Sequence, residues 1–137
     1  CGKPVDNNGT YVDYLKQDKK NNCSRIVDKS DPESKRAELE YKVLDCIQTE
    51  EKDPQYSSLV EIKLLTGRHH QIRVQFSGHG TPLYGDGKYG NNEKAVRKSL
   101  ALCACHLKFK HPATGKIMDF QIKPDTGAFK LFSKSND

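Results

Sequence analysis

Apolar and polar residues alternate along the middle of the chain in a pattern that predicts β-strands. From Ala37 to Val43 every second residue is apolar and the residues between them are charged, which is the period-two pattern of a half-buried strand. A second apolar run of strand type covers residues 58–66. The two runs are joined by the charged and proline-containing segment 50–54, so we expect an antiparallel hairpin.

The same alternation returns toward the C-terminus. It covers residues 101–109, and a turn at residues 112–116 leads into a last strand at 117–123, so these segments predict a second hairpin. The residues predicted to point inward are Cys103, Cys105, Leu107 and Phe109, and those predicted to point outward are His106 and Lys108.

Helix signals are weaker. Thr10 followed by Asp13 fits an N-cap with a capping-box partner, which predicts a short helix at residues 11–16. Asn92 similarly predicts a cap for a short basic helix that ends near Lys98. Residues 21–35 are polar and without periodicity, so they are predicted to form mainly loop.

Residues 70–77 fit two patterns. Ile72, Val74 and Phe76 alternate as in a strand, whereas Ile72 and Phe76 alone are also spaced as on one face of a helix. The residues alone leave both possibilities open. The glycine- and proline-rich segment 78–90 that follows predicts a loop with several turns.

Composition limits the function classes. A chain of 137 residues fits one domain or part of one, and no apolar run approaches the roughly 20 residues that a membrane-spanning helix needs. Five cysteines are an odd number without the dense spacing of a secreted disulfide scaffold, which favours a reducing cytoplasm. The net charge of +5 favours a polyanionic partner such as RNA, although a merely basic protein has the same balance.

The candidate chemistry lies where the apolar run of residues 58–66 ends. Gly67 is expected to adopt backbone angles that a residue with a Cβ atom would resist, and so to aim Arg68 through a tight turn. A guanidinium holds a carboxylate or phosphate through two parallel hydrogen bonds, so Arg68 suggests an anionic partner. A solvent-facing arginine that closes a hairpin is the alternative.

Three segments resemble the C-terminal half of RluA-type pseudouridine synthases. Residues 66–73 read Thr-Gly-Arg-His-His-Gln-Ile-Arg, residues 85–90 read Gly-Asp-Gly-Lys-Tyr-Gly, and residues 107–112 read Leu-Lys-Phe-Lys-His-Pro before Thr-Gly at 114–115. Their order and spacing agree with that family from about Gly9 to Pro124. The resemblance implies an enzyme that isomerises uridine to pseudouridine in structured RNA without cofactor or metal.

The resemblance also implies that essential residues lie outside this chain. The family's catalytic aspartate belongs to a His-Arg-Leu-Asp motif and its base-stacking tyrosine to a Lys-x-Tyr strand, and the printed sequence contains neither motif. We therefore expect residues 1–137 to be the C-terminal part of a catalytic domain, with 125–137 as a tail, that is inactive alone.

For individual residues, the resemblance implies that Arg68 pairs with the absent aspartate. It favours a helix at 70–77, with His69 and Arg73 on one face and unpaired amides beside Arg68. The residues expected to line the active site or contact RNA are Leu65, Thr66, Gly67, His70, Gln71 and Arg73, although packing and helix capping are open as alternatives for His70, Gln71 and Arg73. His69 is expected to have no catalytic role.

Three further features have ambiguous chemistry. Asp86 lies between glycines like an exposed nucleophile, but a turn aspartate that accepts hydrogen bonds from backbone amides is the favoured interpretation. Leu64 and Leu65 are expected in the core, or beside a flipped base, and Tyr84 or Tyr89 is a candidate to line the pocket. Cys103, Cys105, His106 and His111 suggest a metal site, but strand alternation favours packing for the cysteines.

The sequence thus predicts an α+β fold with a mostly antiparallel sheet and a few short helices. The expected function is that of an RNA pseudouridine synthase acting on ribosomal or transfer RNA in the cytoplasm, with no cofactor, metal or membrane partner. The alternatives are a basic RNA-binding module without catalysis and a cysteine-rich zinc protein.

Overall fold

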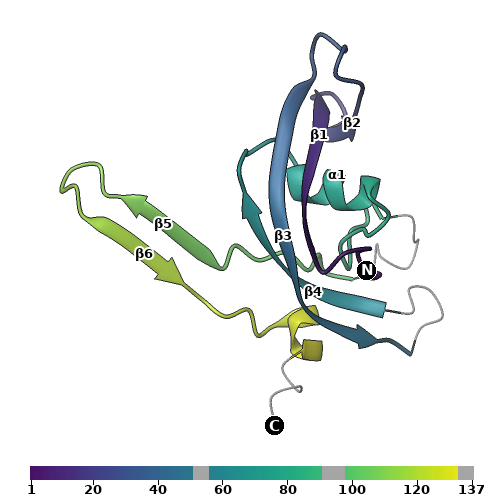
Figure 1. The fold of residues 1–137 in the computed structure, drawn as a ribbon, viewed down its shortest axis with the longest axis vertical. Coiled ribbons are helices and arrows are strands. Elements are labelled where there is room, and N and C mark those ends of the chain that lie inside the picture. The colour runs from purple at the N-terminus through teal and green to yellow at the C-terminus, as the bar shows by residue number, and fades with distance from the viewer. Residues whose placement is uncertain (51–55, 91–97, 133–137) are drawn as a thin grey trace.

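The computed structural model describes residues 1–50, 56–90 and 98–132. Within these residues, one antiparallel sheet of four strands carries a single α-helix on one face, and a separate two-stranded hairpin extends away from it (Figure 1). The strand order in the larger sheet is β2-β1-β3-β4. The elements of the larger sheet and its helix are β1 (Asn8–Asp18), β2 (Cys23–Ile26), β3 (Lys35–Gln48), β4 (Tyr56–Leu64) and α1 (Gln71–Gly78).

The hairpin and the C-terminal turn complete the described chain. They comprise β5 (His106–Lys110), β6 (Ile117–Gln121) and the 3-10 helix η2 (Gly127–Phe132). The predicted class, α+β with a mostly antiparallel sheet and few short helices, is therefore confirmed. None of the described helices is long and apolar enough to cross a membrane.

The hairpin predicted from the central alternation is present. β3 and β4 pair antiparallel, with a shift in register between Val43 and Asp45. Ala37, Leu39 and Tyr41 on β3 are buried, as the period-two pattern predicts. These side chains pack against the helix α1.

The helix predicted at residues 11–16 is wrong, because this segment lies in β1. Thr10 pairs with Glu40 and Tyr11 with Leu39 in the ladder with β3, so Thr10 does not begin a helix. The Asp13 carboxylate accepts hydrogen bonds from α1, not from a capping-box amide. Aromatic and β-branched residues in this segment favour a strand, and pairing with β3 satisfies the backbone groups that a helix would otherwise satisfy.

The loop predicted for residues 21–35 also contains a strand that sequence patterning did not reveal. β2 is only four residues long, and it pairs with the end of β1 from Leu15–Ile26 to Asp18–Cys23. Asn22, just before it, adopts the left-handed conformation with φ 49°. The resulting turn brings β2 beside the start of α1, where it contributes to the site described below.

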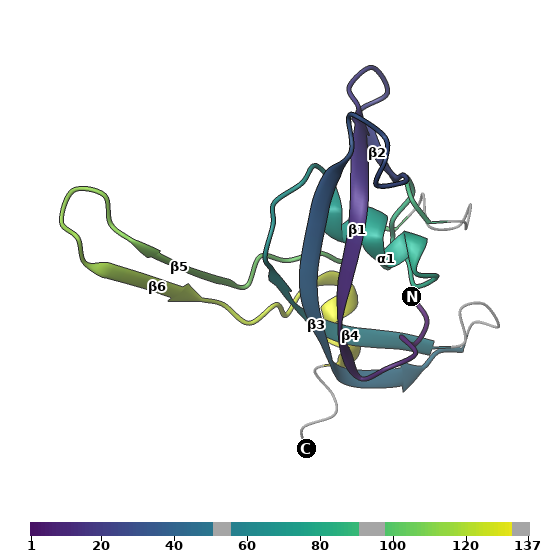
Figure 2. The ribbon, with the colours of Figure 1, turned by 45° about the horizontal axis from the view of Figure 1, so that its top comes forward.

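The core lies between α1 and the sheet (Figure 2). α1 occupies the segment for which strand and helix patterns competed, so the helix expectation is confirmed. Two small clusters of buried residues join helix and sheet: Leu15, Ala37 and Val74 in one, and Leu39, Tyr41 and Phe76 in the other.

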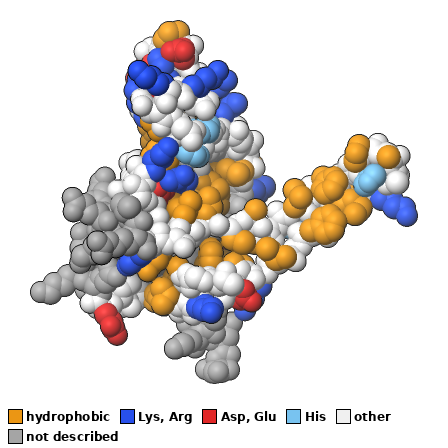
Figure 3. Space-filling model, turned by 180° about the vertical axis from the view of Figure 1, so that it is seen from behind, with side chains coloured by type: hydrophobic (Ala, Val, Ile, Leu, Met, Phe, Trp, Pro, Cys, Tyr) orange, Lys and Arg blue, Asp and Glu red, His pale blue; other side chains and the backbone are white. Residues whose placement is uncertain are grey.

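The second predicted hairpin is present, but its first strand begins at His106 and not at Ala101, and its predicted inward face is not buried. β5 and β6 pair antiparallel, with Leu107 opposite Phe120. Leu107 is 59% exposed, and Phe109 stacks on Phe120 with ring centroids 6.2 Å apart. Hydrophobic side chains are visible along this hairpin in Figure 3. The alternation correctly predicted that Leu107 and Phe109 lie on the same face of the hairpin. Within the described residues, no other element covers that face.

Two predictions concern residues that are only partly described. The short helix expected after Asn92 falls mainly on residues 91–97, outside the described residues. In the expected tail, residues 127–132 form η2, and residues 133–137 lie outside the described chain.

Candidate functional site

The connection between β4 and α1 is anchored to the backbone of β3 at Glu38. The amides of Leu65 and Thr66 both donate to the Glu38 carbonyl oxygen, at 3.1 and 3.2 Å. The Thr66 hydroxyl accepts the Glu38 amide at 2.8 Å and donates to the Gln71 side-chain oxygen at 2.8 Å. These bonds fix both ends of the turn to one position on the sheet.

Gln71 completes this anchor from the first residue of the helix. Its side chain is buried, its Nε2 donates to the Glu38 carbonyl at 3.0 Å, and its Oε1 accepts the Arg68 amide at 2.9 Å. The expectation of unpaired amides beside Arg68 is therefore wrong for the Arg68 amide itself. Gln71 acts here in packing and capping, one of the two roles left open for it.

The turn does not depend on Gly67 in the way the sequence suggested. Gly67 is not among the residues with positive φ, and a Cβ atom added there would meet nothing within 4 Å. The residue in the left-handed conformation is His70, with φ 53° and ψ 26°, which caps α1 without a side-chain hydrogen bond to the helix. The left-handed residue of this connection is therefore His70 and not Gly67.

Arg68 lies at the edge of an open pocket of about 190 Å³. Its Nε donates to the carbonyl oxygen of Arg36 on β3 at 2.9 Å, which orients the guanidinium plane. The apolar lining comes from Leu64, Ile72 and Leu102. The polar lining comes from Arg68, His70, Gln71 and Arg73.

The residues that lead into the turn differ in their relation to the pocket. Leu64 is 48% exposed and Leu65 is 44% exposed, so the expectation that they belong to the core is wrong. Leu64 does line the pocket, in agreement with the alternative of an apolar wall. Leu65, Thr66 and Gly67 support the turn without lining the pocket.

His69 points away from the helix face where it was expected to accompany Arg73. Its Nε2 lies 3.0 Å from the Asn22 side-chain oxygen and its Nδ1 lies 2.9 Å from the Ser24 hydroxyl. Both ring nitrogens of His69 therefore lie within hydrogen-bond distance of residues in or beside β2. His69 lies before α1, which begins at Gln71, and its ring connects the start of the helix to β2.

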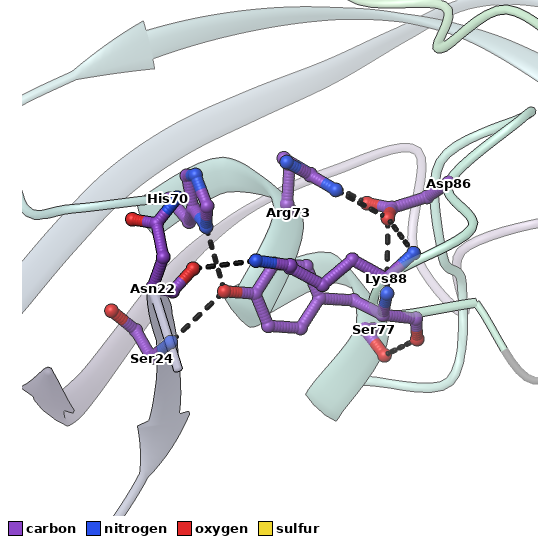
Figure 4. Close-up of polar contacts among 8 residues, drawn as sticks. Asn22, Ser24, His70, Arg73, Ser77, Asp86 and Lys88 are labelled. Atoms are coloured by element: carbon purple, nitrogen blue, oxygen red, sulfur yellow. Dashed lines mark hydrogen bonds and ion pairs between the residues drawn. The ribbon is translucent and has the colours of Figure 1, made fainter. Parts of the chain in front are cut away.

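Arg73 is paired inside the protein with Asp86 (Figure 4). Its Nε and Nη2 donate to the two carboxylate oxygens at 2.9 and 2.7 Å, and the carboxylate also accepts the amides of Lys88 and Tyr89, each at 3.0 Å. Burial alone would raise the pKa of Asp86, but these hydrogen bonds outweigh it and hold the pKa below its ordinary value. The interpretation of Asp86 as a turn residue bonded to backbone amides is confirmed.

Tyr89 connects this loop to β2 and to the pocket. Its hydroxyl accepts the Ser24 amide at 2.9 Å and lies 2.7 Å from Nδ1 of His70. Its ring faces the Arg73 guanidinium, with 5.0 Å between the guanidinium carbon and the ring centroid. The Lys88 ammonium donates to the Asn22 backbone carbonyl at 2.6 Å, so the loop meets β2 at a second point.

Sequence reasoning missed Asn22 and Ser24 as parts of the site. Both lie in or beside β2, a strand too short to give a period-two signal, and their partners are 45 to 66 positions away in the chain. A glycine-flanked Tyr89 gave a hint, since it was one of two tyrosines expected near the pocket. Its bonds to β2 had no sequence signal.

The cysteine and histidine motif near the C-terminus does not converge on one point. Within residues 1–50, 56–90 and 98–132, no three His, Cys, Asp or Glu side chains are grouped as a metal site requires. His106 bonds Asp119 at 2.8 Å, and Nδ1 of His111 accepts the amides of Ala113 and Thr114. Cys103 and Cys105 are free thiols at intermediate exposure, so packing accounts for them only in part.

Comparison with known proteins supplies independent information about this arrangement. Residues 1–78 match the family model described as RNA pseudouridylate synthase. The chain is 37% identical over 110 residues to the ribosomal large subunit pseudouridine synthase D of Zymomonas mobilis, covering 74% of this chain and 32% of that protein. It is 36% identical over 92 residues to the dual-specificity RNA pseudouridine synthase RluA of Yersinia pestis, covering 66% of this chain and 42% of that protein.

A solved structure shares the fold. The human RNA pseudouridylate synthase domain containing 1 superimposes with a TM-score of 0.74 at 22% identity, covering 90% of this chain and 51% of that one. The chain thus spans about a third of the length of the first curated relative and about half of this structural neighbour.

Proposed function

The chain belongs to the RNA pseudouridylate synthase family, of the RluA type, and on that premise we propose that it is the C-terminal portion of the catalytic domain of an enzyme that isomerises uridine to pseudouridine in RNA. The proposal includes residues that this chain does not carry, since the printed sequence has no His-Arg-Leu-Asp motif. The portion described here supplies one wall of the active site and does not catalyse the reaction alone.

The observation that carries the proposal is the position of Arg68. Its guanidinium is oriented by the Arg36 carbonyl at the edge of a partly apolar pocket, and no Asp or Glu is among the described residues that line this pocket. The neighbouring Arg73 is already neutralised by Asp86. Arg68 is therefore free to pair with a carboxylate supplied by another segment, as the family's catalytic aspartate would require.

Such a pair has a definite chemical effect. An arginine within hydrogen-bond distance favours the ionised form of a carboxylate and lowers its pKa, so the aspartate remains available as a nucleophile. Two parallel hydrogen bonds also fix its orientation. The target uridine must leave its stack to reach this group, and the apolar side chains of Leu64, Ile72 and Leu102 offer a surface that an unstacked base can contact.

We propose ribosomal RNA as the substrate class. The support comes from relatives, because the Zymomonas mobilis protein and an Escherichia coli protein 35% identical over 112 residues are both named ribosomal large subunit pseudouridine synthases. A relative named as dual-specific keeps a second RNA class as the alternative outcome. We also place the protein in the cytoplasm, where reducing conditions maintain thiols such as the five free cysteines of this chain.

Tritium release from RNA labelled at uridine C5 tests the proposal. The chain of 137 residues is expected to release no tritium above a blank without protein, whereas the full-length protein releases it from ribosomal RNA. Release by the short chain would contradict the assignment of the nucleophile to another segment. Absence of release by the full-length protein on both ribosomal and transfer RNA, with binding retained, would instead support a basic RNA-binding module, and the coding sequence before Cys1 would then lack His-Arg-Leu-Asp.

A further inference from the structure

His70 occupies an unusual backbone conformation next to the pocket. It is one of two described residues other than glycine with positive φ, and it lines the pocket together with Arg68. Histidine visits the left-handed region more often than most residues, but the conformation persists only where the surroundings enforce it. Here Gln71, which follows directly, is bonded to Glu38 and to the Arg68 amide, so the backbone at His70 is held from the sheet.

The hydrogen bonds of Tyr89 favour one position for the proton on the His70 ring. The Tyr89 oxygen accepts the Ser24 amide, and an amide can only donate. The hydroxyl hydrogen of Tyr89 is then available for Nδ1 of His70, 2.7 Å away, which accepts it. Burial raises the pKa of Tyr89, so this hydroxyl stays protonated in neutral solution.

The charged groups around His70 favour its neutral form. Burial lowers the pKa of His70 first, and the neighbouring charges of His69, Arg73 and Lys88 lower it further, against the opposite effect of Asp86. His69 stacks on the ring with centroids 3.8 Å apart, and Tyr89 meets it edge-on at 5.6 Å. A neutral ring whose Nδ1 accepts a hydrogen bond carries its proton on Nε2.

We propose that His70 is a ligand-binding residue of the Arg68 pocket, which Tyr89 holds in the Nε2–H form so that the ring donates one hydrogen bond to an oxygen of the bound RNA. Tyr89 is then a positioning residue, which acts through His70. The identity of the ligand rests on the proposed function, whereas the protonation of the ring does not. The acceptor is either a phosphate oxygen or a uracil carbonyl oxygen, since each accepts from an imidazole N–H.

Nitrogen-15 NMR of the full-length protein, labelled at histidine, tests the protonation directly. The His70 signals, assigned by their loss in His70→Asn, are expected to show a bare Nδ1 and a protonated Nε2. Tyr89→Phe keeps the aromatic ring but removes the hydroxyl, and it is expected to give a mixture of the two neutral forms. Tyr84→Phe in the same loop is the matched control and should leave the signals unchanged. A proton on Nδ1 in the unmodified protein overturns the proposal, and this result does not depend on the stability of any variant.

Binding of a uridine-containing oligonucleotide tests whether the His70 side chain donates a hydrogen bond to RNA or whether His70 only provides the left-handed backbone conformation. His70→Gly accepts the left-handed conformation but has no donor, and it is expected to weaken binding about tenfold, the factor that corresponds to one lost hydrogen bond. His70→Asn also tolerates that conformation, but its shorter side chain carries its N–H near the position of Nδ1 and not of Nε2, so it should weaken binding about as much as glycine does. If glycine binds as tightly as histidine, His70 serves only the turn and the proposal fails.

An oligonucleotide with an abasic site at the target position distinguishes the two acceptors. If His70→Gly lowers the affinity for both oligonucleotides equally, the acceptor is a phosphate oxygen. If it lowers the affinity for the uridine oligonucleotide alone, the acceptor is the uracil carbonyl oxygen. Both outcomes support a donor at His70. Because binding is measured without isomerisation, failure of the catalytic assignment would leave these results interpretable.

Discussion

Asp86 shows how a single buried charge is stabilised in this fold. It is fully buried, and its four hydrogen bonds come from one edge of the Arg73 guanidinium, through Nε and Nη2, and from two backbone amides of its own turn. Sequence reasoning reached the turn role from the flanking glycines. It did not identify Arg73 as the partner, because a contact between residues 13 positions apart leaves no periodic signal.

We predict that Asp86→Asn lowers the free energy of unfolding by about 3 kcal/mol at neutral pH, because the Arg73 charge loses its buried partner. The folded-state pKa of Asp86 is depressed, so its ionised form stabilises the fold above the unfolded pKa near 4, and this contribution is lost as the pH falls through the folded pKa. The difference between the two proteins should therefore shrink in acid. Urea unfolding at several pH values measures it.

The exposed carboxylate of Asp6 provides the control for this comparison. Asp6→Asn should change stability by less than about 0.5 kcal/mol at every pH. A stability difference for Asp86→Asn that stays constant into acid would show that the carboxylate is not ionised in the fold.

At the scale of elements, alternation predicted the strands that pair over long stretches and failed for those defined by tertiary contacts. β3 and β4 followed from period-two patterns. β1 contains a capping-box signal at Thr10 and Asp13, yet pairing along eight residues of β3 outweighs one local cap. β2 is too short to be recognised, and its place is fixed through the Tyr89 hydroxyl and the His69 ring.

Gly85, in the loop between α1 and β5, has a backbone requirement that the sequence analysis expected instead for Gly67, in the turn between β4 and α1. Gly85 has φ 72°, and a Cβ atom there would collide with the backbone carbonyl of Ser99. Gly67 has open space around it and no positive φ. The two glycines therefore form a matched pair for mutation to alanine.

We predict that Gly85→Ala lowers the free energy of unfolding by about 2 kcal/mol or more, since it combines a disfavoured φ with a backbone collision. Gly67→Ala should be neutral or stabilise by up to about 1 kcal/mol, because alanine reduces the freedom of the unfolded chain. Thermal unfolding of both variants measures the contrast. Equal losses for the two would contradict the backbone geometry described for this loop and turn.

At the scale of the whole molecule, the chain covers about a third of the first curated relative and leaves apolar surface exposed on β5 and β6. The family was predictable because three segments, at residues 66–73, 85–90 and 107–115, resemble its motifs in letters, order and spacing. The site geometry was less predictable, because it depends on β2 and on the loop of residues 85–90. These segments contact the helix start through hydrogen bonds that only the folded chain brings together.

The central claim is that Arg68 orients and charges a carboxylate at the reacting centre and does not act mainly as a phosphate contact. The most direct test is single-turnover conversion of RNA at saturating full-length enzyme, measured beside RNA affinity, for Arg68→Ala, Arg68→Lys and the exposed control Arg25→Ala. We predict that Arg68→Ala lowers the rate by at least about a hundredfold with affinity nearly unchanged, and that lysine restores little because an ammonium lacks the planar two-point contact. Conversion at the unmodified rate, or a loss of affinity alone, in the two Arg68 variants would contradict the account.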